Sequence, residues 1–390
     1  MLMHRMPAVT VLAACAAPAF AQLGSLAPPA GPVIDTGPNL REIEPRTIVN
    51  ETNTPSGGNF DFIISTPGHY VFDGNKSVEA GRDGILITAS DVVLDMNGFS
   101  LTTPLAIIFA SGITISPESE SNVTVRNGTL RNFGDGGVIL PANSLVENVK
   151  VFNGFSSGIT AGDNSTVRNC LVSGNTGPDT IHGILVGDDS RVESCTVKTT
   201  QGSGITCGEQ GQILGNTVVD TQAAGINVGD SSRVVGNLVE NIGTSGVIAG
   251  AACFISDNTV RNTLAFGIRA DMRARVVGNH VVDIGTSSIG VDQGSTVSGN
   301  TISEVAMFGI VIFASDCTAD GNSISFCDSG AFNIGADLSR ITRNDVSASG
   351  GTAGAPGDPG FYIQGNPAIL TRSFIGPTND LMSPWTNVVD

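Results

Sequence analysis

The sequence predicts an all-β fold in which the chain winds as a helix of short parallel strands. A six-residue segment of the type Val-x-Gly-Asn-x-Val recurs every 21 residues, starting at positions 213, 234, 255, 276 and 297. The chain also has 50 glycines and only 14% charged residues, and no long window places apolar residues at helical spacing. A short fixed period indicates one elongated domain of stacked coils, because each repeat contacts only its neighbours.

Each repeat contains three short segments of alternating apolar and polar residues. Alternation directs Ile226, Val228, Val234 and Val239 to the interior and the residues between them to solvent. Strands joined by such short connections can pair with their copies one period away only in parallel. The Gly-Ile-x-apolar segment or a weaker copy begins at Gly84, Gly112, Gly137, Gly158, Gly183, Gly204, Gly225, Gly246, Gly267, Ser288, Gly309, Ala331 and Gly360. We therefore expect 12 to 13 coils within residues 60–365, with a non-repeating cap at the start.

One column of the repeat is occupied by asparagine in seven successive coils. Its members are Asn216, Asn237, Asn258, Asn279, Asn300, Asn322 and Asn344. Asparagine tolerates the left-handed conformation that a sharp bend needs, and stacked amides hydrogen-bond to one another in other stacked sheets. We predict a structural asparagine ladder, not a binding site.

The ends of the chain differ from the repeats. Residues 6–20 are apolar and precede Ala21, which completes a small-x-small cleavage site, so residues 1–21 predict a signal peptide. The alternative is a lipoprotein, because residues 12–15 resemble a lipobox ending at Cys15. The apolar run is too short for a permanent membrane span, and no other segment could provide one. We expect an extracytoplasmic protein with a flexible linker at 22–59 and a C-terminal cap or tail at 366–390.

The charge of the chain limits its partners. A formal net charge of −17 argues against nucleic acid and anionic membranes. Surface acidity of this kind commonly keeps a long protein soluble. Polysaccharides and other components of the cell surface remain as expected partners.

The cysteines do not have the spacing of a zinc site. Cys170 and Cys195 fall in one column of adjacent coils, about 4.8 Å apart, which is within disulfide reach. The alternatives for this pair are a disulfide and two buried free thiols. Cys253 and Cys317 share another column but lie three coils apart, so they cannot bond. Cys207 is expected to point inward.

The repeat Gly-Ile-x-Val followed by Val-x-Gly-Asn-x-Val-x-Asn resembles that of the pectate lyase-like superfamily. Residues 64–71 and 93–99 look like the opening of secreted bacterial β-helix proteins. The resemblance covers residues 60–365 and implies a right-handed parallel β-helix with the pectin lyase fold. It is less specific for activity, because the superfamily contains lyases, hydrolases, epimerases and non-catalytic surface proteins.

Members of this superfamily usually act on the face of the Gly-Ile-x-Val strand. Asp163, Asp188, Glu209 and Asp230 hold matching positions there in four consecutive coils. Carboxylates stacked in this way repel one another and invite Ca²⁺, and lyases of the superfamily hold calcium with such acids. The competing interpretation is that these residues form turns in which Asp accepts backbone N–H bonds.

A second candidate cluster surrounds Arg269, which alternation directs outward. Asp271 and Asp292 lie beside it, and Phe266 and Phe308 flank the same face. The resemblance implies that Arg269 could act as the base of a lyase, with the other four residues binding substrate. The competing interpretation is an ordinary surface pair of Arg and Asp.

Three functional hypotheses follow. The first is a carbohydrate-associated protein that binds, or possibly processes, an acidic polysaccharide through the Gly-Ile-x-Val face. The second is a non-catalytic surface or adhesive rod, and the third is a Ca²⁺-dependent polysaccharide lyase. Short turns and the presence of only two tyrosines and one tryptophan argue against an enzyme. A lyase is favoured over a glycoside hydrolase, because the chain lacks the Gly-His-Gly and Arg-x-Lys segments that polygalacturonase-like enzymes carry.

Overall fold

The computed structural model describes residues 45–107, 110–116, 121–177, 181–335, 338–347, 361–363, 369–371 and 374–375. Residues 46–390 form one compact unit, whose described elements are all β-strands. Within the described ranges, no helix has the length and apolar character needed to cross a membrane. The predicted signal peptide, the lipobox, residues 22–44 and most of the C-terminal tail lie outside the described residues.

One strand of each coil belongs to a 14-stranded parallel sheet, here called sheet B. Its strands are β2 (Phe60–Ile64), β5 (Asp83–Ile87), β8 (Ser111–Ile115), β10 (Gly136–Leu140), β12 (Ile159–Ala161), β15 (His182–Val186), β18 (Ser203–Cys207), β21 (Ile226–Val228), β24 (Val247–Ala249), β27 (Ile268–Ala270), β30 (Ile289–Val291), β33 (Phe308–Ile312), β36 (Gly330–Ile334) and β39 (Phe361–Ile363).

The other strands form a 27-stranded sheet, here called sheet A. The early coils contribute β1 (Arg46–Ile48), β3 (Gly68–Val71), β4 (Lys76–Ser77), β6 (Val92–Asp95), β7 (Ser100–Ile107), β9 (Val123–Phe133) and β11 (Leu145–Phe152). The second strands of the later coils are β13 (Thr166–Arg168), β16 (Arg191–Glu193), β19 (Gln212–Leu214), β22 (Arg233–Val235), β25 (Phe254–Ser256), β28 (Arg275–Val277), β31 (Thr296–Ser298), β34 (Thr318–Asp320), β37 (Arg340–Thr342) and β40 (Ile369–Thr371). The third strands are β14 (Leu171–Asn175), β17 (Thr196–Thr200), β20 (Thr217–Thr221), β23 (Leu238–Ile242), β26 (Thr259–Thr263), β29 (His280–Ile284), β32 (Thr301–Val305), β35 (Ser323–Cys327), β38 (Asp345–Ser347) and β41 (Phe374–Ile375).

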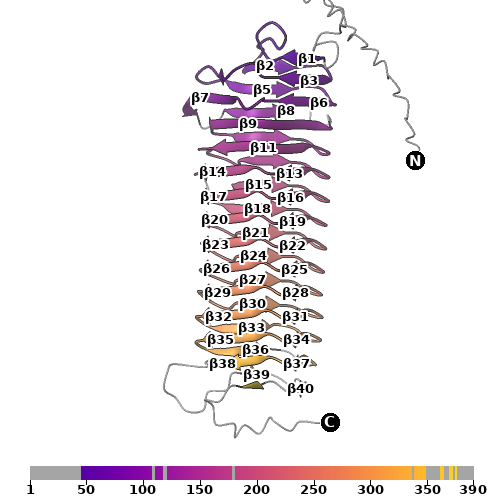
Figure 1. The fold of residues 1–390 in the computed structure, drawn as a ribbon, viewed down its shortest axis with the longest axis vertical. Coiled ribbons are helices and arrows are strands. Elements are labelled where there is room, and N and C mark those ends of the chain that lie inside the picture. Colours follow the sequence, from indigo (N-terminus) through magenta and orange to yellow (C-terminus); the bar gives the residue numbers. More distant parts are fainter. Residues whose placement is uncertain are drawn as a thin grey trace, which may run out of the picture. The chain divides into compact units, whose positions relative to one another are not determined.

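Strands pair with their copies one coil away, always in parallel. Ile226 of β21, for example, lies opposite Ile205 of β18 on one side and Val247 of β24 on the other. Figure 1 shows the result as coils stacked from β2 to β39. The predicted stack of three-stranded coils is confirmed. Sheet B has 14 strands, because Phe60–Ile64, which was expected to form a cap, pairs in parallel with β5 as a first coil.

The folded part also extends beyond the predicted bounds at both ends. Residues 46–48 lie inside the predicted linker, yet they form β1 and pair with β3. The next residues are ordered too, because Val49 is buried and the Asn50 side chain accepts the N–H groups of Thr52 and Asn53 in a local turn. At the other end, β40 and β41 pair with β37 and β38, so the coils continue past residue 365.

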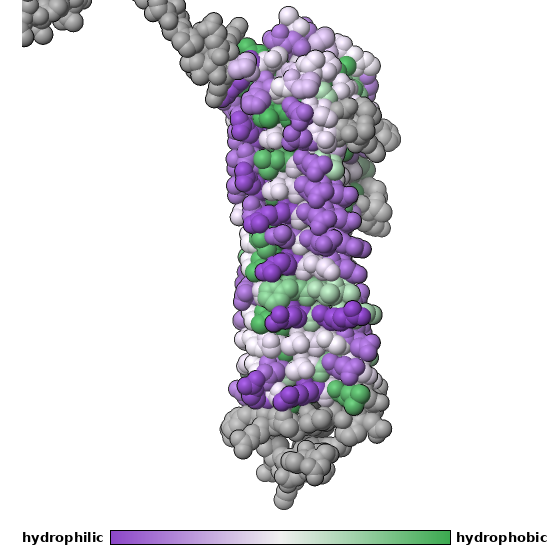
Figure 2. Space-filling model, turned by 90° about the vertical axis from the view of Figure 1, so that its right-hand side faces the viewer, coloured by the Kyte–Doolittle hydropathy of each residue, from purple (hydrophilic) through white to green (hydrophobic). Residues whose placement is uncertain are grey.

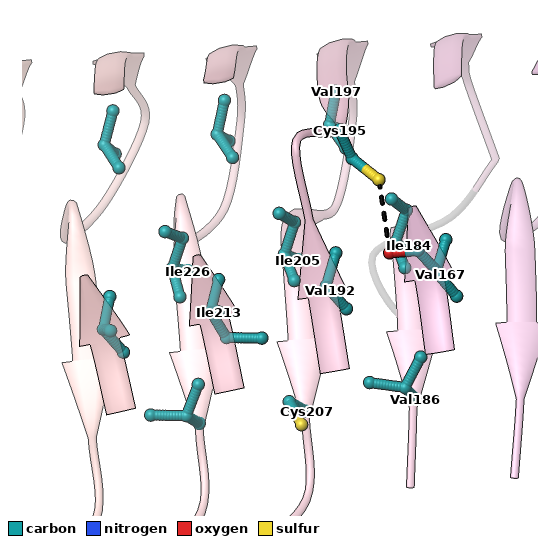
Figure 3. Close-up of a cluster of buried hydrophobic side chains, with 14 of the residues drawn as sticks. Val167, Ile184, Val186, Val192, Cys195, Val197, Ile205, Cys207, Ile213 and Ile226 are labelled. Carbon is teal, nitrogen blue, oxygen red and sulfur yellow. Dashed lines mark hydrogen bonds between the residues drawn. The ribbon is translucent and has the colours of Figure 1, made fainter. Parts of the chain in front are cut away.

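The interior follows the predicted alternation. Ile226, Val234 and Val239 have 0% exposure, and Cys207 points inward as expected. Figure 3 shows how Ile184, Ile205 and Ile226 occupy one column in adjacent coils. Burying an aliphatic side chain of this size stabilises a fold by roughly 1.5–3 kcal/mol. Burial also raises the pKa of the Cys207 thiol to about 12, so this thiol stays protonated at neutral pH.

The asparagine ladder forms as predicted, and it is buried. In the first six members, Nδ2 donates to the Oδ1 of the next ladder residue at 2.8–3.0 Å. Each Nδ2 also donates to a backbone carbonyl of an earlier coil. From Asn237 onward, each Oδ1 also accepts the backbone N–H of the preceding ladder residue. The amides are therefore paired within an interior from which water is excluded.

The expected conformation of the ladder residues is wrong in one respect. None of them has positive φ; the left-handed residue is the one before, such as Gly236 (φ 69°), Asp257 (φ 57°) or Arg343 (φ 53°). The reason is geometric, because the left-handed residue makes the bend while the asparagine after it already points into the interior. Glycine fills the bend position in most of these coils, since it takes positive φ without strain.

Cys170 and Cys195 precede the ladder in the same column, and both are free thiols in the structure. The N–H of Cys170 points to Sγ of Cys195 at 3.5 Å, and the N–H of Cys195 donates to Oδ1 of Asn216 at 2.9 Å. The Cys195 thiol also donates to the carbonyl of Val167, as Figure 3 shows. The neighbouring Cys195 thiol and burial together hold the pKa of Cys170 above its ordinary value.

Candidate functional site

The first predicted cluster forms a column of turn residues on successive coils. Oδ1 of Asp163 accepts the N–H of Asp188 at 2.9 Å, and Oδ1 of Asp188 accepts the N–H of Glu209 at 2.7 Å. Asp230 repeats the arrangement with the N–H of Ala251 at 2.8 Å. Each aspartate thus accepts a backbone hydrogen bond from the next coil. This agrees with the competing interpretation of these residues as turn residues.

These acids do not converge on one point. In the described part of the chain, no group of three or more His, Cys, Asp or Glu residues is placed to hold a metal ion. The observed hydrogen bonds engage Asp163, Asp188 and Asp230 individually, so the arrangement does not fit a shared Ca²⁺ site.

The second predicted cluster is assembled in the structure around Arg269. Nη2 of Arg269 forms an ion pair with Oδ2 of Asp292 at 2.7 Å, and Nη1 donates to the carbonyl of Ala270 at 2.7 Å. The guanidinium carbon also lies 4.5 Å from the ring centroid of Phe313. The cation is therefore held from three directions by a carboxylate, a carbonyl and an aromatic face.

Sequence reasoning missed Phe313. Its ring packs edge-on against Phe266, with centroids 6.1 Å apart. Gly290 makes room for both rings, because a Cβ there would lie 2.9 Å from Cε1 of Phe266 and 3.0 Å from Cε2 of Phe313. Alignment of the coils could have identified Phe313 in the sequence. It occupies the same column as Asp271 and Asp292, one coil after Asp292.

The remaining predicted residue, Phe308, is placed at the start of β33. It is half-buried, and its N–H donates to Oγ of Ser287 at 3.4 Å. It shares a column with Phe266 but lies two coils further along. Phe266 and Phe308 therefore lie on either side of Gly290 along the stack, and the ring that contacts Phe266 in the cluster is Phe313.

An open groove runs beside this cluster at the turn between sheet B and the second strands. Its volume is about 550 Å³, and it is lined by Asp230, Ala251, Asp271, Met272, Asp292, Gln293 and Ala314. Five of these, at positions 230, 251, 272, 293 and 314, come from five successive coils. The groove thus joins one acid of the first predicted cluster to two acids of the second.

The groove combines polar and apolar groups. Asp271 and Gln293 are exposed, and the Met272 side chain is 43% exposed. Carboxylates accept hydrogen bonds from hydroxyls, and the amide of Gln293 both donates and accepts. Ligand sites are commonly apolar surfaces with a few placed polar groups, and this groove has that character in an open form.

The family model described as "Right handed beta helix region" matches residues 62–211 and 111–265, which together span more than half of the chain. The A-module of the mannuronan C-5 epimerase AlgE4 of Azotobacter vinelandii aligns with a TM-score of 0.52 at 16% identity, covering 79% of this chain and 91% of that one. The surface adhesin PfbA of Streptococcus pneumoniae aligns with a TM-score of 0.36 at 11% identity, covering 76% and 84%. No curated protein matches the sequence.

Identities this low show a shared fold alone. The family match and the alignment with the A-module agree with the parallel coils described above. The chain therefore belongs to the right-handed β-helix family.

Proposed function

We propose that the protein binds a linear polysaccharide along the groove. The observation that carries the proposal is that the groove crosses five successive coils. Four coil spacings of about 4.8 Å give a track roughly 19 Å long. A track of that length suits several units of an extended chain better than a single sugar.

The chemistry of the lining supports a carbohydrate ligand. Asp230, Asp271 and Gln293 supply acceptors and a donor for sugar hydroxyls, and Met272 supplies an apolar surface for the C–H faces of a sugar ring. The similar A-module is named as a mannuronan epimerase. This name supports a polysaccharide ligand here as part of the proposal.

The arrangement favours binding without turnover. A lyase base must be deprotonated before it can take a proton from the substrate. Arg269 instead donates to Asp292 and to the carbonyl of Ala270, and both acceptors stabilise the protonated guanidinium. A non-catalytic surface protein that holds polysaccharide satisfies this geometry. We also propose that the protein is exported, either through its signal peptide or as a lipoprotein.

Affinity electrophoresis of the full chain through gels containing acidic and neutral linear polysaccharides tests the proposal. We expect retardation by at least one polymer, and loss of that retardation in the Asp271→Asn, Gln293→Ala double variant. The matched control is Asp283→Asn, Gln222→Ala, which makes the same changes at exposed positions outside the groove lining. Migration unaffected by every polymer, or equal losses in both double variants, would contradict the proposal.

A further inference from the structure

A strip of planar side chains, two exposed arginines and a half-buried phenylalanine, runs along the second strands, next to the groove. Arg233 of β22, Phe254 of β25 and Arg275 of β28 lie directly opposite one another in three successive coils. The guanidinium carbons of Arg233 and Arg275 lie 5.2 Å and 5.7 Å from the Phe254 ring centroid. The ring is thus held between two cations, which fixes both guanidinium groups on the surface.

The strip continues into the groove through one turn. Arg273 is exposed and lies between Met272, which lines the groove, and Arg275. The strands of the strip lie on the right of Figure 1, which is the side that Figure 2 shows, where hydrophilic surface surrounds hydrophobic patches. The strip and the groove are therefore successive parts of one corner of the coil.

These three arginines differ from most others in the chain. Seven arginines in the described ranges form ion pairs with Asp or Glu: Arg82, Arg126, Arg168, Arg191, Arg261, Arg269 and Arg343. Over the same ranges, no ion pair joins a carboxylate to Arg233, Arg273 or Arg275. In a chain with a net charge of −17, this corner keeps three exposed arginines outside the ion pairs found among the described residues.

We infer that Arg233, Arg273 and Arg275, held by Phe254, bind the anionic groups of an acidic glycan whose chain lies along the groove. Guanidinium groups bind carboxylate and sulfate oxygens through paired N–H donors. The inference rests on the proposed polysaccharide function and adds the charge class of the polymer. It also assigns binding of the anionic groups to the second strands, whereas the sequence-based hypothesis assigned it to the strands of sheet B.

Charge spacing favours a glycan over other polyanions. Arg233 and Arg275 are two coils apart, which is about 10 Å at a coil spacing of about 4.8 Å. Duplex DNA carries one charge per roughly 1.7 Å of its axis, and an acidic membrane is charged over a broad area. Either would bring many negative charges against the acidic remainder of this surface. A single chain with widely spaced charges can place those charges on the strip while its uncharged groups lie along the groove, whose lining includes Asp230, Asp271 and Asp292.

Biolayer interferometry on immobilised polymers tests the inference. Polygalacturonate is compared with its carboxyl-reduced form, and dextran sulfate is compared with dextran, so each pair shares a backbone. We expect the wild-type chain to prefer at least one acidic polymer by about tenfold or more, a difference of roughly 1.4 kcal/mol. The preference should weaken with added salt, since exposed charges are screened.

The Arg233→Gln, Arg275→Gln variant should lose this preference. The control variant Arg168→Gln, Arg261→Gln removes the same charge from arginines that are paired with glutamates, and it should keep the preference. Thermal melts of both variants check that the fold persists. Retained preference in the first variant, or equal loss in both, overturns the inference.

The failure of the inference is distinguishable from that of the proposed function. Equal wild-type binding to the acidic and neutral members of each pair, still sensitive to Asp271→Asn, overturns only the assignment of the arginines. Absence of binding to all four polymers overturns both.

Discussion

Replacing Asn258 with alanine is expected to destabilise the stack by roughly 2–6 kcal/mol. The change removes the Oδ1 that accepts the Asn237 N–H at 2.9 Å and the Nδ2 that donates to the Val234 carbonyl at 2.9 Å. Both backbone groups would stay in the interior without these partners, and each unsatisfied group costs about 1–3 kcal/mol. The two ladder bonds of Asn258 are also lost. Asn237 Nδ2 and Asn279 Oδ1 each keep one other partner, the Ile213 carbonyl and the N–H of residue 258, so neither is left unpaired.

Guanidinium chloride unfolding followed by far-ultraviolet circular dichroism measures the loss. The matched control is Asn262→Gly, an exposed asparagine of the same coil with φ of 52° whose Nδ2 donates to Asn241 at 2.7 Å. Glycine keeps that backbone conformation, so the control should cost only about 0.5–1.5 kcal/mol. Because repeat arrays can unfold in parts, exchange of the Asn237 N–H gives a local readout. A cost for Asn258→Ala no larger than that of the control would refute the reasoning.

Burial lowers the pKa of His182, so near the ordinary histidine pKa of about 6.5 the unfolded chain binds a proton that the folded chain does not. Melting temperature should therefore fall as pH decreases through that range, and less so in His182→Asn; identical pH profiles would contradict this assignment. Gly290→Val would crowd Phe266 and Phe313 and should cost about 1–3 kcal/mol in denaturant unfolding. The corresponding change at Asn227, which occupies the same outward column three coils earlier, should be nearly neutral, and equal effects at both positions would argue against the crowding.

Much of the fold was predictable because its stabilising pattern is local and repeated. The alternation around Ile226 and Val234 assigns an inward face, and the period assigns the partner of each strand. The bend was harder to predict, because it falls one residue before the asparagine column, and Arg343 adopts a left-handed conformation that its residue type does not signal. The first coil was missed because Phe60–Ile64 lacks the Gly-Ile motif, although it pairs in parallel with β5.

The candidate site was predictable only in part. Alternation correctly directed Arg269 outward, and column alignment brought Asp292 beside it. The role of Phe313 depends on the absence of a side chain at Gly290, and a missing group leaves no positive signal in a pattern. The proposed role of Arg233 depends on its having no ion pair with a carboxylate among the described residues. Which residues lie near it is set by the three-dimensional structure.

The asparagine ladder also bears on how such a chain can change in length during evolution. Each ladder amide contacts only the coils next to it, and the bonds between Asn237, Asn258 and Asn279 are closely alike. Deleting one whole 21-residue unit would join Asn237 to Asn279 through the same hydrogen bonds. The 22-residue spacings from Asn300 to Asn322 and from Asn322 to Asn344 keep the same bonds, so a turn can also gain a residue without breaking the column. Gain or loss of coils is therefore compatible with the ladder wherever an asparagine returns to this column.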